Sequence, residues 1–143
     1  MGVNMFDTFD HAGAFDAAKE AEYALRCEEF LTLWVPHNRK VIDEFYGIAS
    51  KVRVDMEREH YGARAVYEIM RFHTMTREDS SDFKLNNNYV SLVARFIMAK
   101  FPQFDGFFKT RKISDLPEAR AKLIFEAAMR RAGMARPTQA ELF

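Results

Sequence analysis

The spacing of apolar residues along the chain predicts helices and few or no strands. Apolar positions repeat at intervals of three and four residues, and runs in which β-branched residues alternate with polar ones are absent. Segments with the helical spacing cover residues 13–34, 38–61, 63–77, 88–101 and 116–132. We therefore expect an all-α fold, a compact bundle of about five helices.

Residues that start or stop helices support these boundaries. Pro36 forbids continuation of the first helix, and Asn38 can cap the second. Gly62 offers a left-handed residue at the end of the second helix, and Gly133 does the same after the fifth. Asp115–Glu118 forms an acidic variant of the capping box at the start of the fifth helix.

The predicted helices differ in how their apolar residues are distributed. The second has one apolar stripe, which we expect to face the core: Val41, Phe45, Ile48, Val52 and Met56. In the third, His73 falls on the apolar face, where a histidine is more often a hydrogen-bonded core residue than a base. The fourth, 88–101, is apolar around most of its circumference, so we expect it to be central or covered by a partner.

Composition favours one soluble domain over residues 1–143, with 1–12 and 134–143 flexible or docked on a partner. Of 143 residues, 48% are hydrophobic, which is enough for a substantial core. The 14 phenylalanines and 8 methionines indicate either a bulky core, which we favour, or an adhesive partner surface. A single cysteine excludes an internal disulfide, and no signal peptide or bilayer-spanning run is found, so we expect a cytoplasmic protein.

Charge is distributed unevenly in a chain whose formal net charge is zero. Residues 1–25 carry a net charge of −4, whereas residues 83–112 carry six cationic residues against Asp105, a net of +5. The two regions can attract each other. A dedicated nucleic-acid domain is usually basic overall, but a neutral chain can still bind phosphate with one face.

One segment, KLNNNYVSLVARFIMAKFPQFDGFFKTRK, spans Lys84 to Lys112. With the preceding helix AVYEIMRFHT, it resembles a family of small uncharacterised proteins encoded by bacteriophages and prophages. The hallmark is a lysine, a hydrophobic residue and an asparagine pair, followed by an alanine-arginine pair and a proline. The resemblance covers about Phe30 to Lys112 and implies a phage context in the host bacterial cytoplasm, without any catalytic residue. By analogy, phage accessory proteins of this size are often regulators or inhibitors of host machinery.

Motifs for catalysis or metal binding are sparse. Glu57 and His60 form one Glu-x-x-His pair, but a di-iron carboxylate bundle needs two such pairs and two further glutamates. Cys27 lacks the flanking signature of a nucleophile, and glycine-rich phosphate loops and Gly-x-Ser-x-Gly elbows are absent. We expect no metal, no cofactor and no enzymatic activity, and we identify no small-molecule substrate.

The basic segment supplies the candidate nucleic-acid contacts. They are Asn87, Asn88, Ser91, Arg95, Lys109, Arg111 and Lys112. The asparagine triplet 86–88 can cap a helix or contact bases and phosphates. Arg95 is either the ion-pair partner of an acid on the second or third helix, which we favour, or an exposed contact. Phe107 and Phe108 beside the cations resemble the combination of stacking and charge that binds single strands.

Two binding functions follow. The helices 63–77 and 88–101 have the order of a helix-turn-helix, with a short basic hairpin or loop after Pro102 as its wing. The long connection 78–87 and the narrow polar face of the second helix count against that form. We predict a non-catalytic phage accessory or regulatory protein that binds nucleic acid through 84–112. The alternative is a protein-binding inhibitor or scaffold with an exposed Phe/Met surface, or a homo-oligomer.

Overall fold

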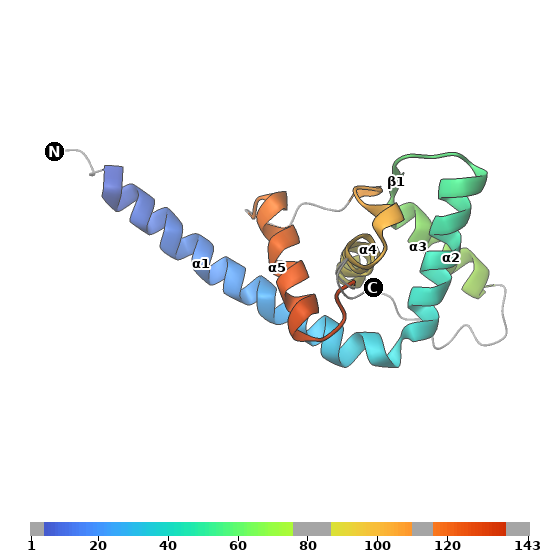
Figure 1. Ribbon diagram of the computed structural model, residues 1–143, viewed down its shortest axis with the longest axis horizontal. Helices are drawn as coiled ribbons and strands as arrows, with labels where there is room; N and C mark the ends of the chain where they lie inside the picture. Colours follow the sequence, from blue (N-terminus) through green and yellow to red (C-terminus); the bar gives the residue numbers. More distant parts are fainter. Residues whose placement is uncertain (1–4, 76–86, 110–115, 137–143) are drawn as a thin grey trace, which may run out of the picture.

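Helix α4 (Asn87–Lys100) lies at the centre of the fold, with the other elements around it (Figure 1). The computed structural model describes the backbone of residues 5–75, 87–109 and 116–136, and side chains over 17–73, 89–109 and 116–136. The other α-helices are α1 (Met5–Glu29), α2 (Arg39–Asp55), α3 (Ala63–Met75) and α5 (Glu118–Arg131). The all-α prediction is confirmed. Within these ranges, no helix combines the length and apolar character needed to cross a membrane.

Helix α1 begins earlier than predicted, at Met5, and its first part extends away from the rest of the molecule (Figure 1). It crosses α5, where Glu20 accepts hydrogen bonds of 2.7 and 2.8 Å from Arg120. These hydrogen bonds lower the pKa of the Glu20 carboxyl group. The acidic N-terminal region therefore does pair with a cation near the other end of the chain, although Arg120 lies outside the basic segment 83–112.

Pro36 changes the hydrogen-bond pattern of the helix but does not stop it at once. After α1 the chain forms a π-helix, η1 (Phe30–Trp34), and a 3₁₀-helix, η2 (Val35–His37). Proline has no N–H to donate to a helical hydrogen bond. The N–H of the neighbouring Val35 donates to the carbonyl oxygen of Phe30, five residues earlier, whereas an α-helix would use the residue four positions earlier. Asn38 occupies the N-cap position of α2, but its side chain donates to the Trp34 carbonyl oxygen at 2.8 Å instead of capping α2.

The core-facing stripe of α2 is Ile42, Phe45, Ala49 and Val52. Val41 and Ile48 are only partly buried, and Met56 is 56% exposed, so placing Met56 in the core was wrong. The reason is that α2 ends at Asp55. Glu57, with φ of 53°, is the left-handed residue that follows the helix, a role that the sequence had assigned to Gly62.

Strands β1 (Tyr61–Gly62) and β2 (Phe108–Lys109) form a two-residue parallel pair, with Tyr61 opposite Phe108. The segment after Pro102 forms a 3₁₀ turn, η4 (Pro102–Phe104), and then a turn at Gly106, whose φ is 68°. The predicted basic hairpin is not found over the described residues, because β2 pairs with β1, a strand that precedes α3.

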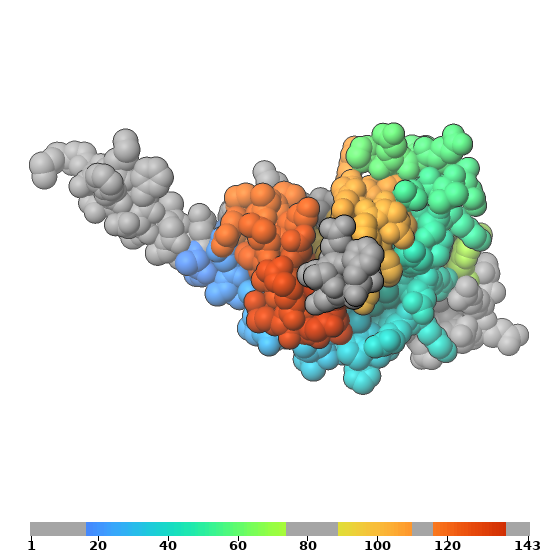
Figure 2. Space-filling view, viewed as in Figure 1, coloured from blue at the N-terminus to red at the C-terminus, as the bar shows by residue number. Residues whose placement is uncertain are grey.

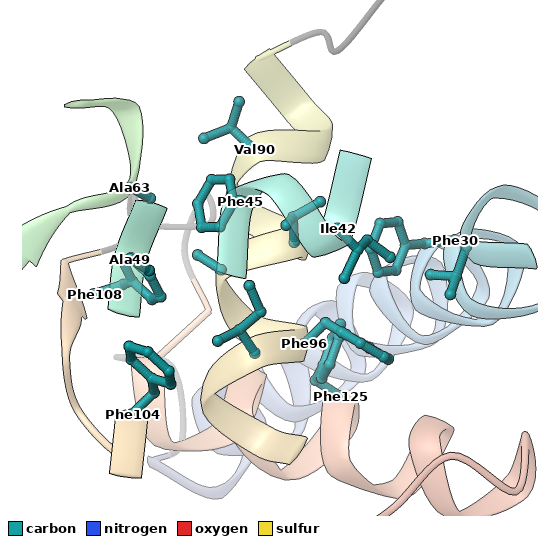
Figure 3. Close-up of a cluster of buried hydrophobic side chains, with 14 of the residues drawn as sticks. Phe30, Ile42, Phe45, Ala49, Ala63, Val90, Phe96, Phe104, Phe108 and Phe125 are labelled. Carbon is teal, nitrogen blue, oxygen red and sulfur yellow. The ribbon is translucent and has the colours of Figure 1, made fainter. Parts of the chain in front are cut away.

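Aromatic side chains join the elements into one core (Figure 3). Phe30 of η1 lies 6.5 Å from Phe96 of α4 and 6.3 Å from Phe125 of α5, between ring centroids. On the other side of α4, the Phe45 ring of α2 lies 5.4 Å from that of Phe108. The bulky-core interpretation of the phenylalanines therefore holds for most of those described; Phe72, 67% exposed, is an exception.

Helix α3 packs Val66 and Met70 inward, but His73 is exposed. The prediction of a core histidine was therefore wrong, since the buried face of α3 does not continue as far as position 73. Helix α5 ends as predicted, with Gly133 at φ of 70°. Met134 N–H bonds the Met129 carbonyl and Gly133 N–H bonds the Arg130 carbonyl, the pair of bonds that defines a Schellman motif.

Candidate functional site

Arg95 is buried and paired with Glu118, the first residue of α5. Its guanidinium donates two hydrogen bonds to the Glu118 carboxylate, at 2.7 and 3.0 Å. The ion-pair interpretation of Arg95 is confirmed, but the partner is on the fifth helix and not on the second or third. Arg95 is only 4% exposed, so its assignment as a nucleic-acid contact was wrong. Of the two residues of the predicted capping box, Glu118 binds Arg95, and Asp115 lies outside the described residues.

Two ionisable side chains of α1 lie in the core near this pair. Tyr23 is 4% exposed and Cys27 is fully buried. Burial raises the pKa of the Cys27 thiol to about 11, and burial also raises the pKa of Tyr23. A thiol that stays protonated at neutral pH is a poor nucleophile, so the geometry matches a buried, inert cysteine.

From Tyr89 onward, helix α4 does not present a surface that could read bases. From Tyr89 to Lys100 every side chain is buried or partly buried. The Ser91 hydroxyl oxygen is buried without a hydrogen-bond partner within the described part of the chain, so it does not reach solvent. Asn87 and Asn88 are the first two residues of α4, and their side chains lie outside the described ones. The helix-turn-helix interpretation was wrong because its recognition helix is the central helix of the core.

The aromatic pair next to the cations is also internal. Phe107 and Phe108 are 2% and 5% exposed, with their ring centroids 5.0 Å apart in an edge-on arrangement. They pack against Phe104 and cannot stack on bases. Lys109 follows them in β2 and is exposed. Arg111 and Lys112 lie outside the described residues.

A pocket of about 400 Å³ lies between α4, the turn at 105–109 and α5. Lys109 and Lys122 both line it, although they come from β2 and α5. In Figure 2, α5 and the segment that leads to β2 are exposed on the same face of the molecule. Sequence reasoning missed Lys122, because one lysine on the polar face of a helix carries no local signal.

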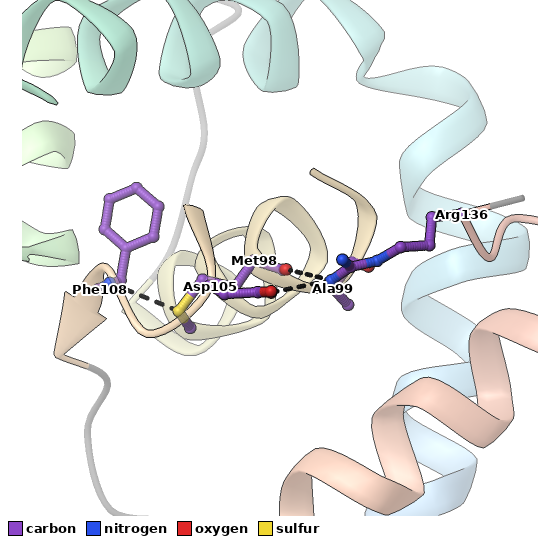
Figure 4. Close-up of polar contacts among 5 residues, drawn as sticks. All are labelled: Met98, Ala99, Asp105, Phe108 and Arg136. Carbon is purple, nitrogen blue, oxygen red and sulfur yellow. Dashed lines mark hydrogen bonds and ion pairs between the residues drawn. The ribbon is translucent and has the colours of Figure 1, made fainter. Parts of the chain in front are cut away.

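Arg136 fixes the turn of this pocket to the end of α4 (Figure 4). Its guanidinium donates to the carbonyl oxygens of Met98 and Ala99, at 3.2 and 2.9 Å, and to the Asp105 carboxylate at 2.8 Å. The Phe108 N–H donates to the Met98 sulfur at 3.4 Å. Arg136 thus satisfies carbonyl groups of the last helical turn and neutralises Asp105.

Glu57 and His60 do not form the helical pair that their spacing suggested, since both follow the end of α2. The His60 Nδ1 atom lies 3.3 Å from the Gly106 carbonyl oxygen. Over the described ranges, no group of three or more His, Cys, Asp or Glu side chains is placed to hold a metal ion.

Comparison of the chain with protein-family models, with curated proteins and with solved structures gives no match.

Proposed function

We propose that the protein acts by binding and not by catalysis, and that its partner is nucleic acid contacted through phosphate groups. The observation that carries this proposal is the shared position of Lys109 and Lys122 at one pocket between β2 and α5. Two cations brought together from distant parts of the chain raise the local positive potential more than either does alone. The proposal keeps the phage accessory or regulatory role that the family resemblance implies.

The charges of the surrounding residues support a positive surface. Asp105 is neutralised by Arg136, and Glu118 by Arg95. Lys109 and Lys122 have no hydrogen bond or ion pair to any described residue, which leaves their ammonium groups available. Arg111 and Lys112, which follow Lys109 closely in the sequence, are also cationic but lie outside the described residues.

A further cation lies along α5, at Arg130. Arg130 lines a neighbouring hollow of about 600 Å³, and Ala99 and Glu126 line both this hollow and the first pocket. Lys122 and Arg130 are eight residues apart, roughly 12 Å along the helix axis at 1.5 Å per residue. Such a spacing allows contact with separate phosphates of one strand. Because Phe107, Phe108 and the described side chains of α4 are internal, we expect phosphate contact without base readout, and so little sequence preference.

Charge reversal tests this function. The double variant Lys109→Glu/Lys122→Glu should weaken binding to a generic oligonucleotide by at least about tenfold, which corresponds to about 1.4 kcal/mol. The matched control is Lys40→Glu/Lys51→Glu, which makes the same change in net charge at two exposed positions of α2. An equal loss of binding in both double variants would contradict the proposed site, because the effect would then follow net charge alone.

A further inference from the structure

We infer that the pocket between α4, the 105–109 turn and α5 binds a small molecule with an apolar body and an anionic head, such as a medium-chain carboxylate. This site goes beyond nucleic-acid binding, since the ligand enters the pocket and does not lie across the surface. The volume of about 400 Å³ falls within the range of about 300 to 1,000 Å³ that is typical of small-molecule sites.

The walls of the pocket fit an apolar body. Met98 of α4, Phe108 of β2 and Phe125 of α5 line it from three sides. Both phenylalanines are otherwise buried, at 5% and 1% exposure, so they are held in place by the core. The Phe108 N–H to Met98 sulfur contact further fixes one wall. The pocket is therefore largely preformed, which reduces the entropy lost when a ligand binds.

The charges of the pocket favour an anionic head over a cationic one. Six charged residues line it: Arg95, Asp105, Lys109, Glu118, Lys122 and Glu126. Two of the three acids are already bound, Glu118 by Arg95 and Asp105 by Arg136. Lys109 and Lys122 then face Glu126 alone, so the unneutralised charge is positive. A carboxylate head next to these two lysines would meet two donors with no partner among the described residues.

Octanoate and octanol are suitable probes, because they share a chain length and differ in the charge of the head. Nuclear magnetic resonance titration of the ¹⁵N-labelled protein should show saturable octanoate shifts at the amides of Met98, Phe108 and Lys122. Octanol should bind at least about tenfold more weakly, since it offers no charge to the lysines. The absence of saturable octanoate shifts at millimolar concentration, or equal affinity for the two probes, would overturn the inference.

Variants separate this site from nucleic-acid binding. Lys122→Glu should weaken octanoate binding by about tenfold, whereas Lys51→Glu on α2 should not change it. Ala99→Leu adds bulk at the pocket wall and changes no charge, in a helix that tolerates leucine, so it should weaken octanoate binding by a larger factor than oligonucleotide binding. Arg130→Glu, outside the pocket, should weaken only oligonucleotide binding. Octanoate binding that is unaffected by both Lys122→Glu and Ala99→Leu would place the ligand elsewhere and contradict the assignment.

Discussion

Arg95 and Glu118 form a bidentate ion pair whose two partners differ greatly in exposure. The Arg95 side chain is 4% exposed and the Glu118 side chain is 59% exposed. The pair connects the central helix α4 to the first residue of α5. Only the arginine has been taken out of water, so the cost of breaking the pair depends on which partner is removed.

Removal of the acid should be the more damaging change. Glu118→Gln leaves the buried cation without its carboxylate and should lower the free energy of unfolding by about 3 kcal/mol. Arg95→Met leaves a glutamate that water can solvate, and an apolar side chain of similar length, so we expect a loss of only about 1 kcal/mol.

Urea denaturation of the two single variants and of the double variant measures this asymmetry. The double variant should resemble Arg95→Met, because the stranded charge is then absent. A larger loss in Arg95→Met than in Glu118→Gln would show that the account of the ion pair is wrong.

Helix α2 gives a matched pair of core and surface substitutions. Phe45 is fully buried, so Phe45→Ala should cost about 3 to 5 kcal/mol. Met56, past the end of the helix and 56% exposed, should change stability by less than about 0.5 kcal/mol when replaced by Ala. Chemical denaturation checks both. A comparable loss of stability in the two variants would mean that Met56 belongs to the core-facing stripe after all.

Two glycines should respond to alanine in opposite directions. Gly133 has φ of 70°, so Gly133→Ala should destabilise the protein by about 1 kcal/mol. Gly47 lies within α2, and an added Cβ there has no atom within 4 Å, so Gly47→Ala should stabilise the protein by about 0.5 to 1 kcal/mol. Thermal unfolding of the two variants should give melting temperatures on opposite sides of wild type, and shifts of the same sign would refute the assignment.

The sequence predicted what depends on local spacing and failed where distant residues decide. Helical periodicity predicts the five helices, and Gly133 marks the end of the fifth through its backbone freedom. The partner of Arg95 lies 23 residues further along the chain, and nothing local indicates it. The pairing of β1 with β2 spans a still longer separation. Phe108 and Lys109 are adjacent in the sequence, which suggested a single surface for stacking and charge. In the extended chain, however, one side chain points inward and the other outward.

Buried ionisable groups make stability sensitive to alkaline pH. The pKa of Cys27 rises from 9 to about 11 in the fold, so between these values the unfolded chain loses a proton that the native state keeps. Stability therefore falls as pH rises through this interval, by about 2 to 3 kcal/mol for this group at 1.36 kcal/mol per pH unit. Tyr23, whose pKa is also raised, acts in the same direction.

Cys27→Ala separates the contribution of the thiol. Denaturation midpoints measured from about pH 8 to about pH 11 should fall less steeply in the variant than in wild type, because alanine has no proton to lose. Identical slopes would mean that Cys27 is not protected from ionisation in the folded state.

The salt dependence of oligonucleotide binding by the wild-type protein tests the proposed function most directly. If the surface around Lys109 and Lys122 neutralises about three phosphates of duplex DNA, the logarithm of the binding constant should fall linearly with the logarithm of salt concentration, with a slope near −3. Fluorescence anisotropy with labelled duplexes of unrelated sequence measures this slope, and unrelated sequences should give similar affinities. Binding that does not change with salt, or no binding to duplex or single-stranded DNA or RNA at low ionic strength, would contradict the account and favour a protein partner.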